Sequence, residues 1–213
     1  FNVSGFSFSG VPGVIIGHNA QIAWGFTNLT TDVSDLYIEV VDGENYWRDG
    51  VLVPLDVRTE TITVAGGKPV ELEIRSTVHG PIVSGLTDDF TAIASDPRMG
   101  TIGEPQDLTS APEGEYAVSL RWTALDAGNT ASAVFAINAA SNWTEFRAAA
   151  QLFEVPAQSL VYADIEGNIG YQTPGRLPIR GASDGSMPSP GWDSRDDWTG
   201  MIPFDELPTV YNP

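Results

Sequence analysis

The 213-residue sequence contains no cysteine, which excludes disulfide bonds, thiolate metal sites and a cysteine nucleophile. It has only two histidines, His18 and His79, and neither an HExxH pair nor a GxSxG nucleophile elbow accompanies them. A histidine-type metal centre is therefore excluded, and each histidine is expected to make structural hydrogen bonds. No apolar run approaches the roughly 20 residues that a membrane-spanning helix needs.

Basic residues are also scarce. Ten Lys and Arg face 28 Asp and Glu, so the formal net charge is -18 and the pI is near 4.1. Such a chain has little with which to neutralise phosphates, and nucleic-acid binding is excluded. The acidic excess indicates a solvated surface, with a cation at one acidic cluster as the functional alternative. The length and a hydrophobic content of 42% are enough for a buried core.

Alternating apolar and polar residues predict a β-rich chain of the α+β class. Hairpins are expected over 14–25, 46–53, 56–78 and 159–172. Further strands are expected over 1–9, 36–40, 82–83, 91–94 and 116–123. The segment 95–115 is rich in Gly, Pro, Asp and Glu, which predicts a long exposed loop.

A helix is expected over 142–153. The apolar run 130–138 fits a strand or a helix, and the helix is favoured because alanine dominates. Asn142 would cap the helix over 142–153, with Glu145 three residues further on in a capping-box arrangement. Beyond residue 174 the chain is rich in Pro, Gly and Asp, so we expect an extended segment held in place by tryptophans.

One stretch carries an unusual pattern. Residues 10–39 fit GxPGVxxGHNxxIAWGxTNxxxDxxDLYxE, and the words TVHGP, RWTAL, YADxxGNIGY and LPxxYNP follow in order. This series resembles the signature of the penicillin acylase family of N-terminal-nucleophile hydrolases, which cleave acyl groups from β-lactams and other acylated amines. The resemblance covers nearly the whole chain, and the acidic loop 95–115 is its main departure.

The resemblance implies a partial Ntn-hydrolase fold with incomplete sheet layers, an antiparallel β-meander and one to two helices. It divides the chain into four ranges. These are catalytic-core strands with the oxyanion and calcium loop (1–36), a β-meander (37–94), an exposed loop (95–115), and a strand, helix and hairpin that return to the core before an extended end (116–213).

The resemblance also assigns a catalytic role to Asn28, whose backbone N–H would form half of an oxyanion hole. The nucleophile of the family is a serine at the free N-terminus of the β-chain, with its own amine as base. That serine would lie before Phe1, and the second oxyanion asparagine would follow Pro213. Both ends are therefore expected to be cuts through a larger protein, and the fragment alone is expected to be inactive. Considered without the resemblance, Asn28 is an ordinary turn residue.

Calcium is the metal that the resemblance implies. Asp32, Asp35 and the Ser34 carbonyl match three of its oxygen ligands, and the loop 183–185 is the expected further contributor within this chain. The remaining ligands would come from the α-chain and other missing segments, so binding by the fragment should be weak. Two loop aspartates are otherwise explained by solvation or capping.

The acyl pocket implied by the resemblance involves Ile15, Ile16, Phe26 and Trp122, although all four are also plausible core residues. The amide hydrolysed is left open between a β-lactam side chain, an N-acyl homoserine lactone and similar substrates. The expected partners are the α-chain and the rest of the β-chain, and the expected location is periplasmic or secreted. The alternatives are a calcium-binding, β-rich extracellular binding module and a purely structural β-domain.

Overall fold

The computed structural model describes residues 2–96 and 110–213, which form two compact units. Unit 1 consists of Phe1–Val33, Asp126–Ile179 and Gly200–Pro213, and unit 2 of Ser34–Leu125 and Arg180–Thr199. Both units are rich in antiparallel strands, so the predicted β-rich α+β class is confirmed. The four ranges expected along the chain describe segments rather than packing, and they stay predictions.

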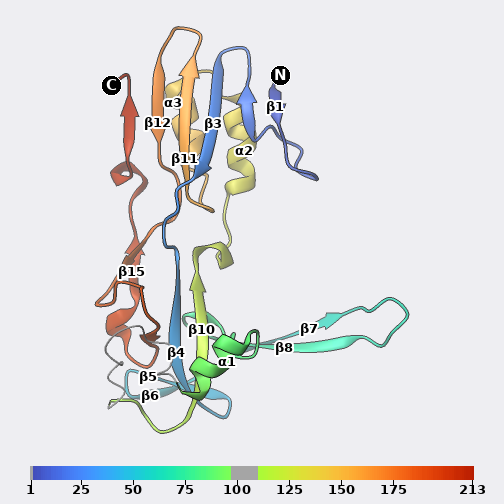
Figure 1. Ribbon diagram of the computed structural model, residues 1–213, viewed down its shortest axis with the longest axis vertical. Coiled ribbons are helices and arrows are strands. Elements are labelled where there is room, and N and C mark those ends of the chain that lie inside the picture. The colour runs from blue at the N-terminus through green and yellow to red at the C-terminus, as the bar shows by residue number, and fades with distance from the viewer. Residues whose placement is uncertain (1, 97–109) are drawn as a thin grey trace. The chain divides into compact units, whose positions relative to one another are not determined.

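Unit 1 contains a six-stranded antiparallel sheet (Figure 1). Its order is β1-β2-β3-β11-β12-β16, with bounds β1 Ser4–Phe6, β2 Ile16–His18, β3 Ile22–Asn28, β11 Gln158–Asp164, β12 Ile169–Gln172 and β16 Thr209–Tyr211. The two predicted hairpins, β2–β3 and β11–β12, are confirmed and become neighbours because β3 pairs with β11 along its whole length. The strand expected over 1–9 is shorter than predicted.

Helices α2 (Thr130–Ala139) and α3 (Trp143–Ala150) cover one face of this sheet, behind the strands in Figure 1. The core lies between them and includes Trp24, Phe146 and Leu160. The Trp24 indole N–H donates to the Ile15 carbonyl (2.9 Å), which fixes the segment before β2. Both predicted helices are confirmed. Burial of an apolar side accounts for α3, whereas α2 buries Ala133 and Ile137 together with the polar Asn138.

The other face of the sheet carries an apolar row. Gly170 packs on Trp143 of α3, so its neighbours in β12 point to the opposite face. Strand pairing lines up one residue from each strand in this row: Phe6, Ile16, Gly25, Val161, Tyr171 and Val210. Phe6 is 80% exposed and Val161 52%. Among the residues of unit 1 that the structure describes, the helix side of the sheet is therefore buried and the other side is largely open.

Unit 2 is built on the sheet β10-β4-β5-β6, with bounds β4 Ser34–Asp42, β5 Asn45–Arg48, β6 Val51–Pro54 and β10 Glu115–Trp122. Strand β14 (Ser189–Pro190) pairs with β4 in parallel. A separate antiparallel sheet contains β7 (Asp56–Ile62), β8 (Val70–Thr77) and β9 (Gly80–Pro81). The short strands β13 (Pro178–Arg180) and β15 (Trp198–Met201) complete the described strands. The hairpins expected over 46–53 and 56–78 are confirmed.

The strand expected over 91–94 was wrong, because these residues lie in a third helix, α1 (Asp88–Ser95). The Thr87 hydroxyl accepts the Phe90 N–H (3.1 Å), and two aspartates occupy the first turn. A cap and acidic residues at a helix N-terminus favour the helix, and both lie outside the short apolar run on which the prediction rested. Of the loop expected over 95–115, residues 97–109 lie outside the described residues.

Candidate functional site

Asn28 is the exposed last residue of β3 and stands opposite Gln158 of β11. The Gln158 N–H donates to the Pro174 carbonyl (3.2 Å), on the side of β11 away from β3. The two residues therefore form a non-hydrogen-bonded pair, in which the N–H of each points away from the other strand. The Asn28 N–H consequently lies on the side of β3 that faces β2, and in the described residues β2 pairs only with the first half of β3.

The residues expected to form an acyl pocket in unit 1 occupy different environments. Ile15 is buried, and Phe26 packs edge-on against Phe153 on the helix side (centroids 5.8 Å apart). Ile16 lies on the open face, where its side chain passes over Gly25. Phe26 and Ile16 therefore do not share one side of the sheet, and their pocket role stays a prediction.

Trp122, the fourth residue of the expected pocket, is the last residue of β10 in unit 2. It stands opposite Ser34 in the β10–β4 ladder and is partly exposed. Trp122 therefore marks the same end of the β4 sheet as the expected calcium ligands, and its contact with an acyl group stays a prediction.

Asp35, the second residue of β4, is buried and held by a cation. Arg180 makes a bidentate ion pair with its carboxylate, with Nε 2.9 Å from Oδ2 and Nη2 2.8 Å from Oδ1. The Trp198 indole N–H also donates to Oδ2, and the Arg121 guanidinium lies 4.7 Å from the Trp198 ring centroid. Paired guanidinium bonds of this kind are strong and directional. The carboxylate is thus fixed in place, and the Arg180 guanidinium balances its charge.

Gly185, in the loop 183–185, lies against this ion pair, and the expected contribution of this loop to a calcium site stays a prediction. A Cβ added at Gly185 would stand 2.6 Å from Asp35 Oδ1 and 2.3 Å from Arg180 Nε, so only glycine fits there. Next to it, the buried Ser183 hydroxyl has no hydrogen-bond partner among the described residues. Carboxylate and hydroxyl oxygens are among the donors that calcium takes.

The other two expected calcium ligands, Asp32 in unit 1 and Ser34 in unit 2, are exposed. Within the ranges that the structure describes, no three His, Cys, Asp or Glu side chains are arranged to hold a metal ion. Calcium takes about six to eight oxygens, so its shell would need backbone oxygens and ligands from outside these 213 residues. The donor set fits calcium in part, and the site stays a prediction.

A buried charged network in unit 2 was not predicted from the sequence. His79 donates from Nδ1 to Glu39 (2.8 Å) and from Nε2 to Asp197 (2.9 Å). Arg48 completes the row through a short bond to Asp197. Two carboxylates, which only accept when ionised, face the two ring nitrogens and favour the doubly protonated ring, and the Arg48 guanidinium also lies 3.4 Å from Nε2. The only sequence signal for this network was the tight turn after β8 that holds His79. The residues that pair with His79 are remote from it in the sequence.

Further contacts hold this network in place. The Thr77 and Ser119 hydroxyls donate to the same Glu39 oxygen as His79, at 2.7 and 2.6 Å. Tyr37 stacks on the imidazole, with the ring centroids 3.7 Å apart and an angle of 4° between the ring planes. Burial alone would lower the pKa of His79, but its two carboxylate partners outweigh burial and raise that pKa above 6.5. The network is therefore a fixed ion-pair chain, as expected for a structural histidine.

Comparison with known proteins identifies the class. A family model described as penicillin amidase matches residues 1–213. The acyl-homoserine lactone acylase QuiP of Pseudomonas aeruginosa is 32% identical over 205 residues, covering 94% of this chain, and penicillin G acylase of Escherichia coli is 32% identical over 219 residues, covering all of it. A solved thermostable penicillin G acylase from Alcaligenes faecalis superposes on the whole chain with a TM-score of 0.77 and 30% identity.

These relatives share one class, the acylases. The chain belongs to the penicillin amidase family. It spans 22–23% of the length of the two curated relatives and 35% of the solved chain. The described residues include no helix long and apolar enough to cross a membrane.

Proposed function

We propose that this chain is part of an amidohydrolase that hydrolyses the amide of an acylated amine through an acyl-enzyme on an N-terminal serine outside these 213 residues. The match to the penicillin amidase family over the whole chain supports this proposal. The substrate class we propose covers β-lactam side chains and N-acyl homoserine lactones, because relatives named for each are about equally similar.

The observation that carries the proposal is the direction of the Asn28 N–H. A backbone donor stabilises a developing oxyanion only if strand pairing has not already used it. The Asn28 amide satisfies this requirement, because its pair with Gln158 is of the non-hydrogen-bonded type. In this proposal the parent protein supplies the nucleophile and the second donor, while β3 supplies one fixed amide.

Proline at position 28 gives the direct test, since proline removes the N–H without removing a β3–β11 bond. In the parent enzyme we expect Asn28→Pro to lower kcat on a phenylacetyl- or fatty-acyl-anilide by about 10²–10³-fold. Asn28→Ala keeps the amide and should stay near wild type. Equal activity of the two variants, with equal melting temperatures, would refute the backbone role. The 213 residues alone should not turn over either anilide.

We further propose that the parent holds a structural calcium at Asp32, Asp35 and the Ser34 carbonyl. When bound, the ion would tie these loop segments together. The Asp35 carboxylate beside Gly185 and the Ser183 hydroxyl, for which the described part of the chain offers no hydrogen-bond partner, support this assignment. Adding a calcium chelator should lower the melting temperature of the parent, and Asp35→Asn should abolish that dependence. If the melting temperature of the wild-type parent changes with neither calcium nor chelator, the proposed calcium site is contradicted.

For the location, we propose the periplasm or the extracellular medium, following the family resemblance. Fractionating cells that express the full-length parent would test this. Recovery of the mature protein only in the cytosolic fraction would contradict the proposal.

A further inference from the structure

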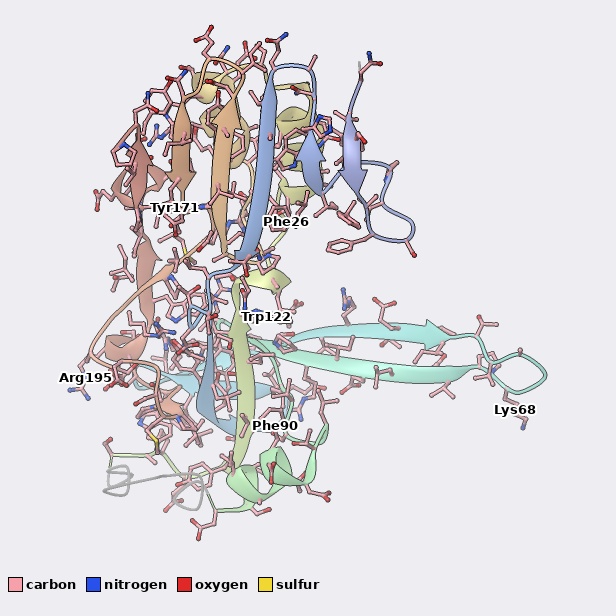
Figure 2. The ribbon with its side chains drawn as sticks, turned by 45° about the horizontal axis from the view of Figure 1, so that its top comes forward. Phe26, Lys68, Phe90, Trp122, Tyr171 and Arg195 are labelled. Carbon is pink, nitrogen blue, oxygen red and sulfur yellow. The ribbon has the colours of Figure 1, made fainter. Side chains whose placement is uncertain are left out.

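The β7–β8 hairpin extends away from the rest of unit 2, with Lys68 at its tip (Figure 2). All seven residues of β7 are exposed. Among the described residues, β8 is paired on its other side by the two residues of β9 and by a hydrogen bond from the Ile82 N–H to the Arg75 carbonyl (2.8 Å), all at the hairpin base. Two strands alone are marginally stable in water and need a surface to pack against. A long, regular hairpin without such support in the described part of unit 2 therefore calls for a partner.

The register sorts the hairpin into two unlike faces. Residues that stand opposite each other in an antiparallel pair share a face. Ile62 stands opposite Val70, and Leu72 and Ile74 follow on the same side at every second position of β8. Ile62 and Val70 are each 51% exposed, and Leu72 is 48% exposed. These four residues form one continuous stripe, hereafter the apolar face.

The opposite face is polar. Its residues are Val57, Thr59, Thr61, Glu71, Glu73 and Arg75, of which only Val57 is apolar. On the apolar face the charged residues are Asp56, at the base of the hairpin, and Arg58 and Glu60, which pair with each other at 3.2 Å. The apolar face thus has apolar residues toward the hairpin tip and the Arg58–Glu60 ion pair next to them. The polar face carries two glutamates. This arrangement matches a hairpin that lies on a surface by one side and meets water with the other.

We propose that the apolar face docks onto an apolar surface of the parent protein formed by polypeptide outside these 213 residues. The chain spans only 22–25% of the length of its curated relatives, so most of the surface of such a protein is contributed by other segments. The Arg58–Glu60 pair beside the stripe carries no net charge, and the remaining charge on this face, Asp56, lies at the base of the hairpin away from the stripe, so the stripe suits an apolar protein surface rather than a charged ligand. The proposal rests on family membership and does not require the amidase activity.

Photo-cross-linking in the parent protein tests the proposal. A benzoylphenylalanine at position 72 should cross-link to residues outside this segment, and the same group at position 57, on the polar face, should not. Leu72 and Val57 are a matched pair, because their exposures are 48% and 49% and both belong to this hairpin. Cross-links from position 72 to a second copy, or none at all, would overturn the proposed occupant.

A charge-insertion pair provides the second readout. In the parent, Leu72→Glu should lower the melting temperature by several degrees and speed amide exchange in β7 and β8. Val57→Glu should shift the melting temperature by about a degree or less, because it adds charge on the face in contact with water, opposite Arg75. Equal shifts for the two variants would refute a docked apolar face. Neither readout depends on catalysis, so a failed amidase assay would leave this test intact.

Discussion

The imidazole of His79 donates across 2.8 Å to the carboxylate of Glu39, a side chain with no exposed surface. Asp197 on the other side of the ring makes the histidine the centre of a charge row that joins segments far apart in the chain. Removing one partner from a buried pair leaves an uncompensated charge, at a cost of about 3–5 kcal/mol. The stability of unit 2 should therefore depend on this row.

The stability of unit 2 should pass through a maximum in mildly acidic solution. The raised folded pKa of His79 contributes stability that is complete below 6.5 and is lost as pH rises through that higher pKa. Burial raises the pKa of Glu39, but hydrogen bonds from His79 and two hydroxyls outweigh it and bring that pKa below 4.5. The Glu39 contribution is therefore present above pH 4.5 and lost on further acidification. Melting temperatures should peak between these values, and His79→Gln should flatten the alkaline slope.

Gly191 should not tolerate a side chain. An added Cβ would stand 2.3 Å from Glu39 Oε2, a buried oxygen without a hydrogen-bond partner among the described residues. Gly191→Ala should therefore destabilise unit 2 by about 1–3 kcal/mol in urea unfolding, the usual cost of overpacking. Gly85→Ala is the control, because its Cβ would meet no described atom within 4 Å. Equal unfolding midpoints for the two variants would contradict the predicted clash.

Arg180 should be essential for holding Asp35. Arg180→Gln would leave a buried carboxylate without its cation and should cost about 3–5 kcal/mol of unfolding free energy. The double variant Arg180→Gln with Asp35→Asn removes both charges and should recover part of that loss. If the double variant is no more stable than the single variant in chemical denaturation, the ion pair is not what stabilises this loop.

Helix α3 should depend on its cap. The Asn142 side chain accepts the Glu145 N–H (3.0 Å), while the Glu145 carboxylate reaches back to Ser141 (2.9 Å). Asn142→Ala should cost about 1 kcal/mol, and Asn142→Asp, which keeps the capping oxygen, should cost little. Thermal unfolding followed by circular dichroism at 222 nm would compare the two variants. A loss of the same size with aspartate would argue against capping as the cause.

The sequence predicted what is local. Alternation located the hairpins, and the Asn142–Glu145 spacing located α3, although the carboxylate of Glu145 reaches Ser141 and not the backbone of the cap itself. Helix α1 was missed because Thr91 and the apolar residues after it suit either structure, and the cap that decides lies upstream.

The site contacts that were missed are those between distant segments. Arg180 and Asp35 are 145 residues apart, and His79 and Asp197 are 118 apart. No spacing rule reaches so far, because such pairs form only after the sheets have set their register. The direction of the Asn28 amide likewise requires knowing which residue of β11 stands opposite it.

The β3–β11 pairing links the position of the helix-side core residues to the direction of the Asn28 N–H. In β3 the side chains of Trp24 and Phe26 point to the helices, and the Asn28 N–H points to the β2 side by the same two-residue period. Inserting or deleting one residue between Trp24 and Asn28 would reverse that amide toward β11 and move one end of the strand out of phase with the helices. This strand can therefore exchange residues during evolution, but it cannot change its length by one.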